Sequence, residues 1–184
     1  EGVVGPGDVV LLQNEIDVTV TAAAIRHARN CGATMMWNVA PALCGIGLLE
    51  REAIAQADYL IVNAGELDKL HPRRVGEPAT MAAERVIAEL GCARVLVTLG
   101  ADGAALADKY GVQRQAAYRV RAIDTVGAGD CFSGVFAAST AVSQDPVRAL
   151  RLAVVAAGLC VTCEGAQNAM PEESEIRAAS DRLS

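Results

Sequence analysis

The residues best suited to chemistry lie in the segment Asp124–Asp130, which reads Asp-Thr-Val-Gly-Ala-Gly-Asp. Gly127 and Gly129 lack side chains, so their backbone N–H groups can approach an anion closely. The apolar run that follows predicts a helix over 131–142, and the partial positive charge at a helix N-terminus favours a phosphate there. A carboxylate beside that phosphate can take the proton of an attacking hydroxyl, as phosphoryl transfer requires. The segment therefore predicts an anion site with Asp130 as its base.

A simpler interpretation is a loop into a helix, with Asp130 as a cap or first-turn acid and no ligand. The longer pattern Asp-Thr-x-Gly-Ala-Gly-Asp-x-Phe-x-Gly, completed by Phe132 and Gly134, is far more specific. It resembles the signature of the ribokinase-like (PfkB) carbohydrate kinases. The resemblance implies that Asp130 is the catalytic base. It also implies an anion hole formed by the amides of Gly127, Ala128 and Gly129.

Asn63 and Glu66 follow a predicted strand that ends at Val62. By itself, Asn-x-x-Glu predicts a helix start with Asn63 as the cap and Glu66 at the third helical position. The resemblance implies a further role, in which Asn63 contacts the nucleotide and Glu66 positions Mg²⁺ through water. Oxygen ligands and retained waters are what Mg²⁺ prefers.

The segment Thr98–Gly103 reads Thr-Leu-Gly-Ala-Asp-Gly and also ends a predicted strand. A tight turn explains its glycines without any ligand. The resemblance implies that the segment lies along the phosphates and ribose of ATP. The nucleotide-binding residues are then Thr98, Gly100, Asp102 and Gly103. The motif Gly-x-x-x-x-Gly-Lys-Ser/Thr is missing from the sequence, which excludes a P-loop ATPase.

The polar stretch 164–171 separates two predicted helices, and a helix end followed by a new helix start explains it. The resemblance implies that this stretch and Asp124 hold a monovalent cation. Asn168 and Ala169 replace a Pro and a Ser of the related loop, so one hydroxyl ligand is lost. The use of K⁺ is therefore left open.

Glu15 follows the predicted strand 8–13 and matches a sugar-contacting glutamate of the ribokinase subfamily. A solvent-facing carboxylate at a strand end is the alternative. The stretches 38–42 and 165–167 also resemble ribokinases, so the resemblance favours D-ribose as the substrate and D-ribose 5-phosphate as the product. Other sugar kinases of the family, of the fructokinase or ketodeoxygluconate kinase type, remain alternatives.

Strand-like and helix-like segments alternate along the chain. The predicted strands are 8–13, 34–38, 59–62, 94–98, 104–108 and 112–117. The predicted helices are 18–30, 48–56, 81–90, 131–142, 146–163 and 171–182. This alternation predicts an α/β fold of the doubly wound class, with a mostly parallel sheet flanked by helices. Ligands of such folds bind at the carboxyl ends of the strands.

The composition limits the class of protein. Hydrophobic residues make up 52% and aromatic residues 3% of the 184 residues, which indicates an aliphatic core of buried strands. A net charge of −6 argues against a nucleic-acid partner. With no apolar stretch of membrane-spanning length and no signal-peptide pattern, we expect a cytoplasmic protein. The pair Cys160-x-x-Cys163 lacks a second pair, so buried thiols are expected there in place of zinc.

The resemblance covers Val9–Met170 and implies that residues 1–184 are the C-terminal portion of one PfkB domain. The family's N-terminal portion, with its Gly-Gly motif and lid, has no counterpart here, and a start at Glu1 fits a truncated product or an incomplete sequence. The resemblance implies an ATP- and Mg²⁺-dependent sugar kinase, homodimeric through its lid when full length. We expect this portion alone to be inactive. A nucleotide-binding module without catalysis is the alternative, and the number of matches argues against a purely structural domain.

Overall fold

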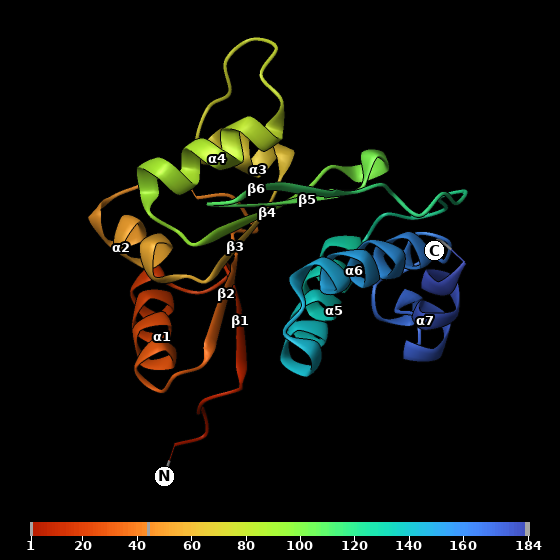
Figure 1. Cartoon of the computed structure of the whole chain (residues 1–184), viewed down its shortest axis with the longest axis horizontal. Helices are drawn as coiled ribbons and strands as arrows, with labels where there is room; N and C mark the ends of the chain where they lie inside the picture. Colours follow the sequence, from red (N-terminus) through yellow and green to blue (C-terminus); the bar gives the residue numbers. More distant parts are fainter. Residues whose placement is uncertain (1, 44, 183–184) are drawn as a thin grey trace. The chain divides into compact units, whose positions relative to one another are not determined.

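The computed structural model describes residues 2–43 and 45–182 and is drawn in Figure 1. The chain folds as two compact units. Unit 1 comprises Glu1–Thr98 and Ala105–Gln113, and unit 2 comprises Leu99–Ala104 and Arg114–Ser184. The interpretation of the chain as one PfkB domain stays a prediction.

One six-stranded sheet forms within the described residues, in the order β1-β2-β3-β4-β5-β6. Its strands are β1 (Val9–Gln13), β2 (Thr34–Asn38), β3 (Tyr59–Asn63), β4 (Arg94–Thr98), β5 (Ala104–Asp108) and β6 (Gly111–Gln115). The first four strands pair in parallel, each with the next along the chain. Helices connect them, which confirms the predicted α/β class with a largely parallel sheet.

Four helices of unit 1 cover these strands (Figure 1). They are α1 (Val18–Asn30), α2 (Leu48–Gln56), α3 (Ala64–Leu70) and α4 (Ala79–Leu90). Helix α1 contacts β2, α3 contacts β3, and α4 contacts β4. The core between them is mostly aliphatic, with Trp37 and Tyr59 as buried aromatic residues. Its side chains include Ile25, Ile54 and Leu96, all without exposed surface. Burial of this apolar surface is the main force that holds the strand ends in place.

Unit 2 is mostly helical. Its elements are the short 3₁₀ helix η1 (Gly100–Asp102), α5 (Ala128–Ser143), α6 (Pro146–Cys160), the 3₁₀ helix η2 (Gln167–Ala169) and α7 (Glu173–Asp181). Helix α6 packs against both α5 and α7. The shared core holds Cys131 of α5, Val155 and Cys160 of α6, and Ile176 of α7. This packing fixes the N-terminal turn of α5, where the signature glycines lie.

The structure corrects several predicted element boundaries. The start of helix α3 at Asn63 was predicted but its extent was not, because seven residues are too few to show a helical period. Helix α5 begins at Ala128, three residues before the predicted start. Helix α6 ends at Cys160, so Cys163 lies outside the helix and is exposed. The last strand and the last helix are also shorter than predicted, at Gly111–Gln115 and Glu173–Asp181.

Two features are missing from residues 2–43 and 45–182. In this part of the chain, no helix has both the length and the apolar character needed to cross a bilayer. The same residues contain no group of three or more His, Cys, Asp or Glu side chains placed to hold a metal ion.

Candidate active site

The carboxyl ends of the parallel strands lie along one edge of the sheet in unit 1. Gln13 at the end of β1 is in register with Asn38 at the end of β2, and Asn63 of β3 is in register with Thr98 of β4. Glu15 lies two residues beyond β1 and is exposed. The fold therefore places Glu15, Asn63 and Thr98 at the edge where ligands of α/β folds bind.

Asn14 fixes the strand end that carries Glu15, a contact that sequence reasoning missed. Its backbone N–H donates to the Ala40 carbonyl at 3.0 Å, and its side-chain amide donates to the Pro41 carbonyl at 2.7 Å. Both acceptors lie in the loop after β2, so the loops that follow two neighbouring strands are tied together. An Asn beside a strand end is a weak signal in sequence, because its partners are 26 and 27 residues away.

Asn63 and Glu66 form the helix start that Asn-x-x-Glu predicts. The Asn63 side chain accepts from the Glu66 N–H at 2.8 Å, and a Glu66 carboxylate oxygen accepts from the Asn63 N–H at 2.7 Å. This reciprocal pair satisfies two N–H groups at the start of α3. It also holds the Glu66 carboxylate beside the strand ends. A carboxylate oxygen at this position fits a contact to Mg²⁺ through water, because Mg²⁺ retains several of its waters in proteins.

The turn after β4 is closed by hydrogen bonds within unit 2. Leu99 N–H donates to the Gly103 carbonyl at 2.8 Å, and Gly103 N–H donates to the Gly100 carbonyl at 3.1 Å. Both glycines have left-handed backbones, with φ of +58° at Gly100 and +93° at Gly103. Gly103 is buried, whereas Gly100 and Asp102 are exposed. Packing therefore explains Gly103, whereas Gly100 and Asp102 are open to solvent, and their role in nucleotide binding stays a prediction.

The two signature glycines at the start of α5 have different structural reasons. Gly127 precedes the helix with φ +78°, and a Cβ there would lie 3.2 Å from the Cα of Ala166. Gly129 is exposed and has no positive φ, and no atom lies within 4 Å of the place a Cβ would take. The fold therefore requires glycine at position 127 but not at position 129. Open space above the first helical turn is what close approach of a phosphate needs.

Asp130 is the third residue of α5 and is exposed in the helix's first turn. Its neighbour Cys131 is buried, and burial raises the pKa of that thiol to about 12. Burial also raises the pKa of the Cys160 thiol, and the nearby negative charges of Asp124 and Asp130 raise it further. Thiols with raised pKa values are poor nucleophiles at neutral pH. The predicted role of Asp130 as the base stays a prediction, and its exposed carboxylate is accessible from solvent.

Two backbone N–H groups hold the Asp124 carboxylate, and its role as a cation ligand stays a prediction. One carboxylate oxygen accepts from the Val126 N–H and the other accepts from the Gly165 N–H, each at 3.0 Å. These two hydrogen bonds, Val126 first, hold the pKa of Asp124 below its usual value. The two bonds fix the orientation of the carboxylate and use two of its roughly four acceptor sites.

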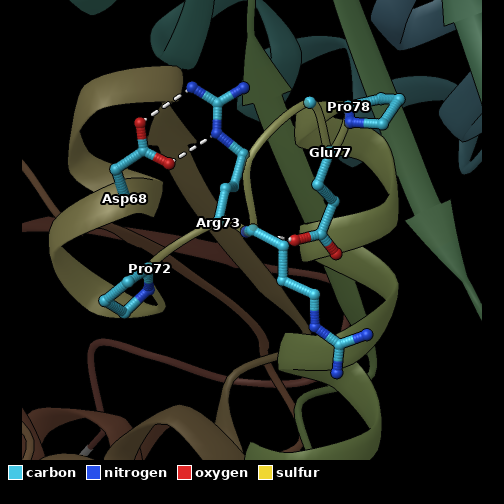
Figure 2. Close-up of a pocket in the computed structure, with 7 residues that line it drawn as sticks. Asp68, Pro72, Arg73, Glu77 and Pro78 are labelled. Atoms are coloured by element: carbon cyan, nitrogen blue, oxygen red, sulfur yellow. Dashed lines mark hydrogen bonds and ion pairs between the residues drawn. The ribbon is translucent and has the colours of Figure 1, made fainter.

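A cavity of about 580 Å³ in unit 1 lies in the loop between α3 and α4 (Figure 2). It is lined by Asp68, Pro72, Arg73, Arg74, Gly76, Glu77 and Pro78. Arg73 pairs with Asp68 through two nitrogens, and Glu77 accepts from Arg85 at 2.9 Å and from the Arg74 N–H at 2.7 Å. The pair with Asp68 ties the loop to α3, and the pair with Arg85 ties it to α4. The lining includes none of the predicted site residues.

Comparison with known proteins agrees with the signature. A model of the pfkB family carbohydrate kinases matches residues 3–173. The chain is 32% identical over 169 residues to a ribokinase of Lactococcus lactis and 32% identical over 167 residues to a deoxyribokinase of Salmonella typhi. These matches cover 92% and 88% of this chain, and 52% of each relative. The chain thus spans about half the length of the curated relatives it matches.

Solved structures show the same likeness. A ribokinase of Thermotoga maritima superimposes with a TM-score of 0.82 at 31% identity, over 95% of this chain and 57% of that one. An Arabidopsis thaliana ribokinase complexed with ribose and ATP gives a TM-score of 0.85 at 29% identity, over 94% and 55% of the two chains. With the family match extending over residues 3–173, this chain belongs to the pfkB family of carbohydrate kinases.

Proposed function

We propose that the protein carrying this chain transfers the γ-phosphoryl group of ATP to the primary hydroxyl of a sugar, with D-ribose as the substrate. The observation that carries the proposal is the start of α5, where Gly129 leaves open space beside Asp130. Several relatives are named ribokinase, and one was solved with ribose and ATP, which supports this choice of sugar and phosphoryl donor.

In the proposed reaction, the hydroxyl oxygen of the sugar bonds to the γ-phosphorus, and the bond from that phosphorus to the bridging oxygen of ADP breaks. Asp130 accepts the hydroxyl proton. The first N–H groups of α5 have no carbonyl partner inside the helix. The amides of Gly127, Ala128 and Gly129 therefore serve as the anion hole for the charge on the transferred group. Ala128 N–H makes only a long 3.4 Å bond to the Thr125 carbonyl, which a phosphate oxygen can replace.

The roles of the remaining predicted residues rest on the family resemblance. Asn63, Thr98, Gly100, Asp102 and Gly103 are proposed to bind the nucleotide, Gly103 by shaping its turn. Glu15 is proposed to contact the sugar. Glu66 would hold Mg²⁺ through water, and the ion bound with ATP would neutralise phosphate charge.

A pentose without the 2-hydroxyl is the second candidate substrate. The observation that favours it is the 32% identity to a Salmonella typhi deoxyribokinase, the same identity as to the Lactococcus lactis ribokinase. Comparing kcat/KM for ribose and for 2-deoxyribose decides between the two sugars.

Titration of the ¹⁵N-labelled chain with MgATP tests the nucleotide site. We expect amide shifts over 127–130 and 98–103. Gly129→Ala is expected to weaken MgATP binding at least about tenfold, because the new methyl group fills the space of a phosphate oxygen. The same change is expected to leave folding intact or to add about 0.5–1 kcal/mol of stability, since Ala is the better helix former.

Gly134→Ala is the matched control, because Gly134 is also an exposed glycine of α5 with no atom within 4 Å of the place a Cβ would take. It is expected to match the stability of Gly129→Ala and to keep the MgATP affinity of the native chain. Equal affinities for the two variants, or shifts confined to residues outside both ranges, would contradict the proposed site.

The 184 residues alone are expected not to phosphorylate ribose efficiently. They span about half of the related kinases, and the resemblance assigns most sugar contacts and the lid to the other half. Positioning of reactants supplies on the order of 7–11 kcal/mol in favourable cases, more than a base and an anion hole alone retain. A coupled ADP-release assay with and without ribose measures this. Ribose-dependent turnover of about 1–10³ s⁻¹ would show the chain to be a complete catalyst.

A further inference from the structure

Asp124 joins two segments of unit 2 that are far apart in sequence. Its carboxylate accepts from the N–H of Val126, two residues on, and from the N–H of Gly165, 41 residues on. The Val161 carbonyl at the end of α6 accepts from the Asp124 N–H at 3.3 Å and from the Ile123 N–H at 2.7 Å. Backbone and side chain thus tie the turn before α5 to the loop after α6.

The turn before α5 and the loop after α6 are also in close contact at Gly127 and Ala166. A Cβ at Gly127 would lie 3.2 Å from both Cα and Cβ of Ala166, and 3.5 Å from the Met170 methyl group. The turn that leads into α5 therefore rests on the loop that begins at Gly165. A shift of this loop moves the backbone from which the first N–H groups of α5 project.

We propose that Asp124 is a positioning residue, whose carboxylate holds the turn 124–127 against the loop at Gly165 and so aims the α5 amides at the phosphate. This role rests on the proposed phosphoryl transfer. Hydrogen bonds to an ionised acceptor are roughly twice as strong as those between neutral groups. One carboxylate with two accepting oxygens is suited to fix both N–H groups together.

Asp124→Asn tests the proposal, because asparagine keeps the size of the side chain but offers only one accepting oxygen. Its amide group must face one of the two N–H groups, donor against donor. We expect faster hydrogen exchange at the Gly165 or Val126 amide. We also expect MgATP binding at least about tenfold weaker, since small misplacements at such sites have large effects.

Asp145→Ala is the control, because it also removes a negative charge and a carboxylate that accepts from backbone N–H groups, but at a distant place in unit 2. Asp145 also accepts from two backbone N–H groups, those of Val147 and Arg148, but it lies at the other end of α6. This variant is expected to lower the stability of unit 2 and to keep MgATP affinity within about twofold of native. Gly165→Ala keeps Asp124 but strains a residue at φ +91°, so it is expected to weaken MgATP binding as Asp124→Asn does.

Each binding curve is measured in potassium chloride and in choline chloride. The proposal expects Asp124→Asn to weaken binding equally in both salts, whereas a loss seen only in potassium would show cation binding and overturn it. Unchanged exchange at both Gly165 and Val126 would also overturn it. If the native chain shows no MgATP shifts, the proposed function fails, and the exchange rates still decide whether Asp124 holds the turn.

Discussion

Replacing Asp130 by asparagine is expected to lower turnover by about 10²–10⁴-fold and to leave ATP affinity nearly unchanged. Asparagine keeps the size and the hydrogen-bonding capacity of the side chain but cannot take the proton of the sugar hydroxyl. Asp130 is exposed in the first turn of α5, so the change leaves the core untouched. Asp130→Ala is less informative, because it also weakens the helix start.

The effect is measured as kcat with ribose. The protein used is this chain if it is active, and otherwise a longer, active protein that contains it. MgATP affinity is measured on the same preparation. Glu173→Gln is the control, since Glu173 is likewise an exposed acid in the first turn of a unit 2 helix, α7. It is expected to keep native turnover. Near-native turnover of Asp130→Asn would remove Asp130 from the base role.

The sheet was the most predictable part of the fold. The strands Thr34–Asn38, Arg94–Thr98 and Ala104–Asp108 were predicted with their observed bounds. Their central residues are buried, and buried strands appear in sequence as short apolar runs between turn residues. Because parallel strands end at one edge of a sheet, this pattern also implied that Glu15, Asn63 and Thr98 lie at the same edge, as the registers show.

The signature identified the family, but it did not separate glycines needed by the fold from glycines that leave room for a ligand. Gly127 and Gly129 look equivalent in sequence. Only the structure shows that Ala166 crowds the first and that no atom lies near the second. Asp124 is a similar case, because its partner at Gly165 is 41 residues away. Such distinctions depend on tertiary contacts, which a local pattern does not record.

Gly103→Ala is expected to cause the largest loss of stability. At φ +93° an L-residue is strained by about 1–2 kcal/mol. The new Cβ would also overlap the Gln115 carbonyl oxygen and lie 2.5 Å from the Ala117 nitrogen, both backbone atoms that cannot rotate away. Overpacking of this kind costs about 1–3 kcal/mol. We therefore expect a loss of about 2–5 kcal/mol in the free energy of unfolding of unit 2.

Gly100→Ala separates backbone strain from steric overlap. Gly100 has φ +58°, but no atom lies within 4 Å of the place a Cβ would take. This control is expected to lose only the strain, about 1–2 kcal/mol. Urea denaturation followed by far-UV circular dichroism compares both variants with the native chain, while the fluorescence of the single tryptophan, Trp37, reports on unit 1. Equal losses for the two variants would show that the contact with residues 115–117 is not what requires glycine at position 103. A larger loss at Gly103 would mean that the fold itself requires this glycine, whatever ligand the neighbouring exposed residues bind.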